Sequence, residues 1–244
     1  MLALLLPIIA LSGCWSPPGE GVAKGCIDQF EIEGELSAGL GVSSHMEWGD
    51  TRTDTAYREF EQAKWSELGV GTARTDFKWS RIEAERGSFD FTGLDRVVDA
   101  GEASDTEILA ILNYGNSWAR ADGESTAPPD DLSDFANYAA TVAEHYAGRV
   151  RHYEIWNEQN IGLTFWRPEE DPVRYGELLA LTSERVRQVD PDALISFGGV
   201  FGPYLLLNTQ GEEYVRQVAA SLPDLSDHID IMAFHPYRYP FSAP

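Results

Sequence analysis

Residues 150–160 read Val-Arg-His-Tyr-Glu-Ile-Trp-Asn-Glu-Gln-Asn, a short apolar run that ends in a cluster of polar side chains. The run Val150–Trp156 is brief and rich in β-branched and aromatic residues, which is typical of a buried parallel strand. Side chains alternate along a strand, so Ile155 is expected to face outward and Trp156 inward. Glu158 then emerges where the strand ends.

The same unit recurs along the chain, with an apolar run followed by a loop and an amphipathic helix. The other predicted strands are Ser37–Ser43, Val70–Phe77, Glu107–Tyr114, Leu194–Gly199 and Ile229–Phe234. The predicted helices are Thr53–Leu68, Leu94–Ala103, Leu132–Tyr146, Pro172–Val189 and Glu212–Ser221. Strands that alternate with helices in this way predict a parallel α/β fold.

Two α/β architectures fit this alternation, a closed barrel and an open doubly wound sheet. An open sheet usually carries a glycine-rich turn after its first strand, whereas Ser43-Ser44-His45-Met46 stands here. A barrel instead places polar and aromatic residues at the carboxyl end of strand after strand. The sequence has such residues at His45, Glu47, Trp48, Asp76, Lys78, Trp79, Asn113, Tyr114, Trp118, Asn157, Glu158, Asn160, His235 and Tyr237. We therefore predict a (β/α)8 TIM barrel, of which this chain holds about six of the eight strand–helix units.

Four motifs resemble those of one enzyme group. Trp156-Asn157-Glu158 resembles the acid/base motif of the retaining glycoside hydrolases of clan A, which include families 5 and 39. Arg74 resembles the strand-two arginine of that clan, which holds the nucleophile ionised, and residues 79–91 resemble the loop that follows it. His235-Pro236-Tyr237 resembles the His-x-Tyr pair that lines the sugar site and touches the nucleophile.

The resemblance covers residues 36–238 and departs from family 5 at the third strand. Family 5 members often carry a histidine where this chain has Asn113 or Tyr114, and residues 112–115 resemble family 39 more closely. The resemblance implies cleavage of β-glycosidic bonds by retaining double displacement, with Glu158 as general acid/base. The resemblance implies that Arg74, Asn157, His235 and Tyr237 bind the substrate. We add Asn113, which follows the third strand, and Trp118, because aromatic faces stack on sugar rings.

A retaining mechanism also needs a second carboxylate as nucleophile. In clan A it stands at the end of the seventh strand, so we expect it beyond residue 244, and we expect the chain to be C-terminally truncated and inactive alone. A non-catalytic cell-surface carbohydrate-binding protein on the same scaffold is the alternative function. A glutamate at a seventh strand would favour the enzyme over this alternative.

The composition of the chain excludes several kinds of binding partner. A net charge of -22, from 18 basic and 40 acidic residues, opposes binding to nucleic acid. The three lysines, Lys24, Lys64 and Lys78, form no polybasic membrane patch. The five histidines show no metal-ligand spacing, so we expect no metal and no other cofactor. The expected partner is an oligo- or polysaccharide substrate.

The first residues predict export. Met1–Leu11 is almost wholly apolar, and Leu11-Ser12-Gly13-Cys14 resembles a bacterial lipobox. We expect a lipoprotein signal peptide over 1–14, a linker over 15–35 and the partial barrel over 36–244. The protein would then lie outside the cytoplasm and touch the membrane only through a lipid on Cys14. The alternative is a signal peptide cut elsewhere, with Cys14 in a disulfide with Cys26.

Overall fold

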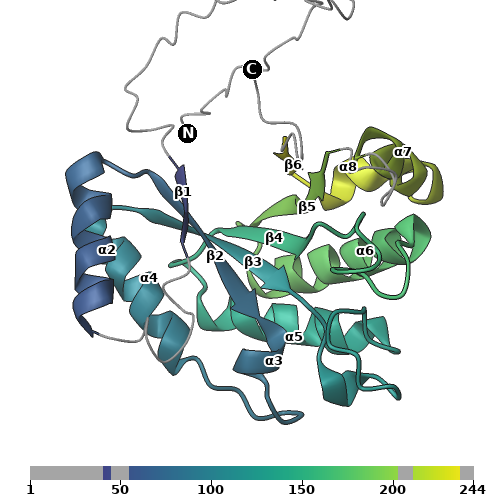
Figure 1. Cartoon of the computed structure of the whole chain (residues 1–244), viewed down its shortest axis with the longest axis horizontal. Coiled ribbons are helices and arrows are strands. Elements are labelled where there is room, and N and C mark those ends of the chain that lie inside the picture. The colour runs from purple at the N-terminus through teal and green to yellow at the C-terminus, as the bar shows by residue number, and fades with distance from the viewer. Residues whose placement is uncertain (1–40, 45–54, 203–210, 237–244) are drawn as a thin grey trace, which may run out of the picture. The chain divides into compact units, whose positions relative to one another are not determined.

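The computed structural model describes residues 41–44, 55–202 and 211–236, all within one compact unit that spans Ser37–Pro244. The described strands are β1 (Gly41–Ser44), β2 (Thr72–Lys78), β3 (Glu107–Asn113), β4 (His152–Asn157), β5 (Leu194–Phe201) and β6 (Ile231–His235). They form one parallel sheet in the order β1-β2-β3-β4-β5-β6, as Figure 1 shows. Each strand therefore pairs with the next one along the chain, as in a barrel wall.

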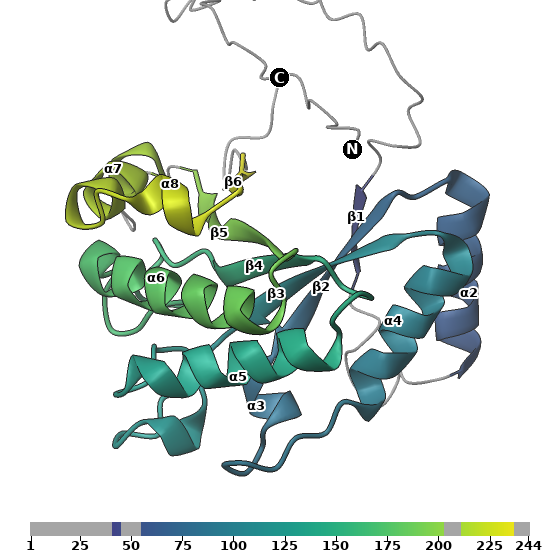
Figure 2. The ribbon, with the colours of Figure 1, turned by 180° about the vertical axis from the view of Figure 1, so that it is seen from behind.

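Helices follow the strands in turn. They are α2 (Thr55–Leu68), α3 (Trp79–Ile82), α4 (Thr92–Ser104), the 3-10 turn η2 (Ser117–Ala119), α5 (Leu132–His145), α6 (Pro172–Val189), α7 (Gly211–Ser221) and α8 (Leu225–His228). The longer helices lie in an arc around one side of the sheet, which Figure 2 shows from behind. The unit is a half-barrel with its helices outside. The predicted partial TIM barrel is confirmed, and the predicted element boundaries differ from the observed ones by a few residues.

Helix α6 shows why the sequence forms these elements. The Asp171 side chain caps the helix by accepting from the Arg174 N–H at 2.9 Å, and Pro172 occupies the first turn. Residues at helical spacing then meet the core, since Tyr175, Leu178, Leu179 and Val186 are all buried. Asp190 ends the helix, which packs along α5.

An aromatic layer lies between the sheet and the helices at the carboxyl ends of the strands. Trp79 stacks on Tyr138 with ring centroids 5.5 Å apart, and Trp156 lies 5.5 Å from Phe135 and 4.9 Å from Trp166. Phe135 and Tyr138 belong to α5, so Trp156 faces the helices. The expected inward orientation of Trp156 is therefore wrong, because a left-handed backbone at this residue interrupts the strand alternation.

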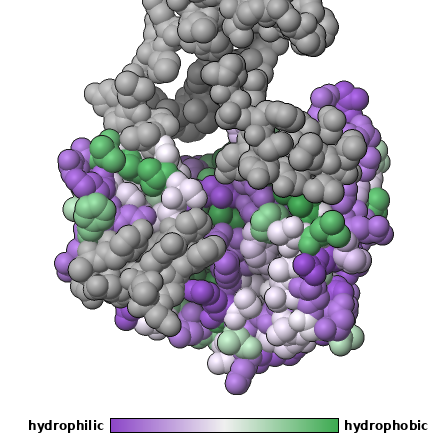
Figure 3. Space-filling model, in the orientation of Figure 1, coloured by the Kyte–Doolittle hydropathy of each residue, from purple (hydrophilic) through white to green (hydrophobic). Residues whose placement is uncertain are grey.

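The surface is mixed in polarity. On the face seen in Figure 3, hydrophobic patches stand apart among hydrophilic residues. The large hydrophobic side chains with the most exposure in the described part of the chain include Phe60 and Leu68 on α2, Leu163, and Phe234 on β6. None of the helices that the structure describes has both the length and the apolarity that a membrane span requires.

Candidate active site

The carboxyl end of β4 has an unusual backbone. Trp156 and Glu158, on either side of Asn157, have φ angles of 71° and 53°, a region that side-chain-bearing residues rarely adopt. The surroundings hold this corner in place. The Glu158 N–H donates to the Gly199 carbonyl at 2.9 Å, and the Trp156 indole donates to the Phe165 carbonyl at 2.7 Å. Strain of this kind concentrates at functional sites, where surrounding contacts maintain it.

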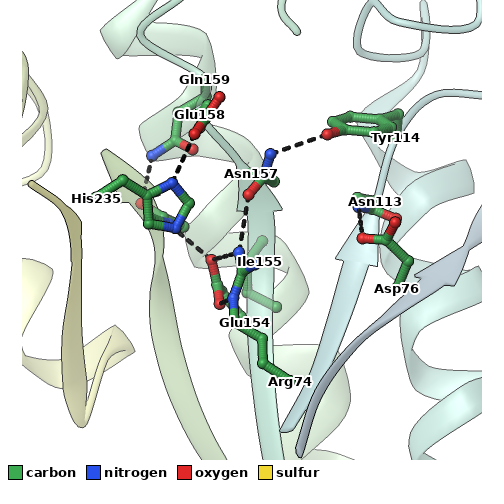
Figure 4. Close-up of polar contacts among 12 residues, drawn as sticks. Arg74, Asp76, Asn113, Tyr114, Glu154, Ile155, Asn157, Glu158, Gln159 and His235 are labelled. Atoms are coloured by element: carbon green, nitrogen blue, oxygen red, sulfur yellow. Dashed lines mark hydrogen bonds and ion pairs between the residues drawn. The ribbon is translucent and has the colours of Figure 1, made fainter. Parts of the chain in front are cut away.

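A buried ion pair stands behind this corner (Figure 4). The Arg74 guanidinium on β2 donates from Nε and Nη2 to the two Glu154 carboxylate oxygens, at 2.7 and 2.8 Å. Glu154 is 1% exposed and also accepts from the Gly199 N–H at 2.8 Å. Burial alone would lower the pKa of Arg74, but the hydrogen bond and the charge of Glu154 raise it overall. Arg74 is therefore charged, and it is bonded to both carboxylate oxygens of Glu154.

Arg74 also orients the Asn157 amide. Arg74 Nη2 donates to Asn157 Oδ1 at 2.8 Å, and Asn157 Nδ2 donates to the Tyr114 hydroxyl at 2.9 Å. Burial, followed by the negative charge of Asp76, raises the pKa of Tyr114 well above its usual value, so the phenol stays protonated. Because the Asn157 amide oxygen accepts from the Arg74 guanidinium, the amide N–H groups point away from Arg74.

Glu158 leaves the other side of the corner. Its carboxylate Oε1 lies 2.7 Å from His235 Nδ1, which β6 contributes. The residue is 9% exposed. Figure 4 shows Glu158 and Asn157 side by side above the Arg74–Glu154 pair. A carboxyl group in this position can exchange a proton with a molecule that reaches the carboxyl ends of the strands.

Two further predicted residues, Asn113 and Trp118, form hydrogen bonds outside this cluster. The Asn113 side chain is buried and donates to Asp76 Oδ1 at 2.7 Å, while Asn113 Oδ1 has no hydrogen-bond partner within the described residues. The Trp118 indole donates to the Glu83 carbonyl at 2.9 Å, and the Arg86 guanidinium covers its ring at 4.4 Å. The role of each in substrate binding stays a prediction.

The structure thus brings Arg74, Asn157, Glu158 and His235 together into one cluster (Figure 4). The predicted residues Tyr237 and Cys14 lie outside the described residues. Glu154 was not among the predicted site residues, although its place inside an apolar strand indicated a role. An acid inside an apolar strand needs a buried partner, and Arg74 is a base inside another such strand.

Known proteins share this fold and part of this sequence. The model of the family described as glycosyl hydrolase family 10 matches residues 35–162, just over half of the chain. An endo-1,4-beta-xylanase A from Phanerodontia chrysosporium is 26% identical over 181 residues, which cover 71% of this chain and 40% of that protein. The chain thus spans less than half the length of this curated relative.

Solved structures agree on the fold. A family 39 glycoside hydrolase from Bacteroides cellulosilyticus WH2 has a TM-score of 0.61 at 23% identity, over 83% of this chain and 39% of its own. A monomeric beta-xylosidase from Caulobacter crescentus CB15 has a TM-score of 0.64 at 19% identity, over 81% and 41%. At these sequence identities the similarity shows a shared fold. The part shared with this chain is less than half of each of those proteins.

Proposed function

The chain belongs to glycosyl hydrolase family 10, and we propose that it acts as a glycoside hydrolase that cleaves β-glycosidic bonds with retention. The observation that carries the proposal is the pairing of Glu158 with His235 beside the oriented amide of Asn157. The motifs suggested families 5 and 39 within clan A, whereas the matched family is family 10.

Glu158 would act twice in this reaction. In the first step its carboxyl proton passes to the glycosidic oxygen while that oxygen leaves the anomeric carbon. In the second step the carboxylate takes a proton from the water that displaces the enzyme from the same carbon. Asn157 donates one N–H to Tyr114, and its other N–H can donate to the sugar 2-hydroxyl.

The nucleophile is a second carboxylate, which retention requires at about 5 to 5.5 Å from the acid/base carboxyl. Glu154 is unsuited to the role, because its oxygens accept from Arg74 and from the Gly199 N–H while the side chain is buried. We propose that the nucleophile is none of the described residues, because the resemblance to clan A places it at the end of a seventh strand and the described strands are β1 to β6.

The substrate we propose is a β-1,4-linked xylan or xylo-oligosaccharide. The names of the related Phanerodontia xylanase and of the Caulobacter xylosidase support it. Hydrolysis of xylo-, cello- and manno-oligosaccharides of equal length would test the choice. We expect turnover of the xylo-oligosaccharide to exceed that of the other two.

The acid/base role is tested by Glu158→Ala in the full-length gene product that contains these residues. We expect kcat on xylo-oligosaccharides to fall by about 10²- to 10⁴-fold, the usual contribution of a general acid or base. Azide should restore turnover of an aryl β-xyloside. Azide attacks the glycosyl-enzyme without a general base, and the phenolate of the aryl xyloside leaves with little help from an acid. The product would be the β-xylosyl azide. Glu107→Ala, on an exposed carboxylate at the opposite end of the sheet, is the control.

Two results would contradict this proposal in different ways. Unchanged kcat in Glu158→Ala would remove the acid/base assignment while leaving the activity. A wild-type protein that binds xylo-oligosaccharides in calorimetry without turning them over would favour the non-catalytic carbohydrate-binding alternative.

We also propose that a lipid on Cys14 anchors the protein outside the cytoplasm. The support is the sequence Leu11-Ser12-Gly13-Cys14, which lies outside the described residues. In a bacterial host, an alkyne-tagged fatty acid should label the wild-type protein and the Cys26→Ala variant but not Cys14→Ala. Labelling of Cys14→Ala would contradict the anchor.

A further inference from the structure

Gly199, in β5, contacts both glutamates of the β4 corner. Its N–H donates to Glu154 Oε1 at 2.8 Å, and its carbonyl accepts from the Glu158 N–H at 2.9 Å. One residue of a neighbouring strand therefore links the carboxylate that holds Arg74 to the backbone of Glu158. Figure 4 shows the two glutamates, Glu154 and Glu158, with His235 beside them.

The space beside Gly199 is occupied by His235. A Cβ atom built on Gly199 would lie 2.3 Å from His235 Nε2, 2.8 Å from Cε1 and 2.9 Å from Cδ2. Side chains do not approach one another so closely, so any residue other than glycine would displace the ring. The same ring places Nδ1 at 2.7 Å from Glu158 Oε1.

The backbone of Gly199 does not itself require glycine. The described glycines with positive φ are Gly69, Gly87, Gly123 and Gly148, and Gly199 is not among them. Its strand is irregular at this point, since the register of β5 on β6 shifts between Phe197 and Val200. Bulges of this kind redirect side chains next to active sites. Gly199 therefore matters because it has no side chain, and not because of its backbone angles.

We propose that Gly199 is a positioning residue for the acid/base. It leaves room for the His235 imidazole to lie against β5 and bond Glu158, while its peptide groups hold Glu154 and the Glu158 backbone. The proposal rests on the proposed function, because it takes Glu158 as the acid/base. The other titratable or charged groups in this cluster are Glu154 and Arg74 from β4 and β2 and Tyr114 at the end of β3.

The first test is a double-mutant cycle between Gly199→Ala and His235→Ala in the full-length gene product. Gly199→Ala should lower kcat by about 10- to 100-fold with little change in KM, as expected for losing a hydrogen bond to a charged group. The double variant should be no slower than His235→Ala alone, because the added methyl acts through the ring. Multiplied losses, or full activity in Gly199→Ala, would overturn the proposal.

The second test needs no turnover and so separates this proposal from the proposed function. In ¹⁵N spectra, Glu158→Gln should move the His235 Nδ1 resonance in the wild-type background. In the Gly199→Ala background the same substitution should leave that resonance in place, because the contact is already broken. An equal change in both backgrounds would show that Gly199 does not position the ring.

Stability supplies the third test, which holds even where Gly199→Ala folds poorly. The three atoms nearest to the added Cβ all belong to His235. Removing that ring should therefore restore the Tm of Gly199→Ala to the Tm of His235→Ala. Gly93→Ala is the matched control, since a Cβ there meets nothing within 4 Å. A double variant that stays as unstable as Gly199→Ala would contradict the steric role.

Discussion

The two ends of the sheet carry similar charged side chains, but these differ in burial and in hydrogen-bond partners. At the carboxyl end of β4, Glu154 and Glu158 are 1% and 9% exposed, and each bonds to a partner from another strand. At the amino ends of β3 and β4, the Glu107 carboxylate is 67% exposed at the side chain and lies 3.6 Å from His152 Nδ1. The first arrangement is a connected, buried network, while the second is a single pair whose carboxylate is exposed.

A hollow in the surface does not by itself mark the proposed site. A hollow of about 600 Å³ lies at the amino ends, lined by residues that include Glu107, Arg149, His152 and Asp192. Arg149 there donates to Asp99 and Glu102 in exposed ion pairs, which water screens. Burial and shared hydrogen bonds, more than volume, distinguish the proposed site, because charges hidden from water must be held by specific partners.

The strongest test of this contrast compares Glu154→Gln with Glu107→Gln. Glu154→Gln removes the charge that Arg74 needs, and breaking a buried pair costs about 3 to 5 kcal/mol. We expect about 3 kcal/mol, at the low end, because the Arg74 side chain is 25% exposed. Glu107→Gln should change the free energy of unfolding by less than about 0.5 kcal/mol. Urea unfolding measures both, and equal losses would remove the contrast.

A second pair of variants compares buried tyrosine hydroxyls. The Tyr175 hydroxyl donates to the Ile155 carbonyl at 3.0 Å and accepts from the Gly198 N–H at 2.8 Å, so it joins β4 to β5 near the site. The Tyr153 hydroxyl donates only to the Val150 carbonyl, at 3.1 Å, among its described contacts.

Tyr175→Phe removes a hydrogen-bond partner from two buried backbone groups and should cost about 2 to 3 kcal/mol, whereas Tyr153→Phe removes one such bond and should cost about 1 kcal/mol. Thermal and urea unfolding of the two variants give the comparison. A larger loss in Tyr153→Phe would mean that the amino end is the more tightly bonded region.

The sequence predicted most of the fold because the fold depends on local patterns. Apolar runs and helical stripes identified all six described strands, and Asp171 and Asp190 marked the ends of α6. These signals lie within a few residues of one another, so no knowledge of distant contacts is needed.

The candidate site was less predictable because its geometry depends on irregular backbone and on distant partners. The alternation rule assumes extended backbone, and the positive φ of Trp156 breaks it. Arg74 and Glu154 are 80 residues apart in sequence, and only the register of three strands brings them together. The space that His235 occupies beside Gly199 likewise lies between two strands, next to a register shift that no local motif encodes.

The smallest predicted effect concerns pH at the amino end. Burial lowers the pKa of His152, and the nearby charge of Glu107 opposes that shift only in part. As pH falls through about 6.5, the ordinary histidine pKa, the unfolded chain takes up this proton before the folded one does. His152 therefore favours folding fully above that pH, and its contribution is lost as pH falls below it.

His152→Gln removes this titration, so the difference in unfolding free energy between wild type and variant should be constant above pH 7.5 and decrease toward pH 5. The slope cannot exceed about 1.4 kcal/mol per pH unit. In the Glu107→Gln background the decrease should be larger, because the opposing charge is gone. Urea unfolding across the pH series measures both. An increase toward low pH would mean that the His152–Glu107 pair holds its proton as a coupled unit, and the amino end would then resemble the carboxyl end.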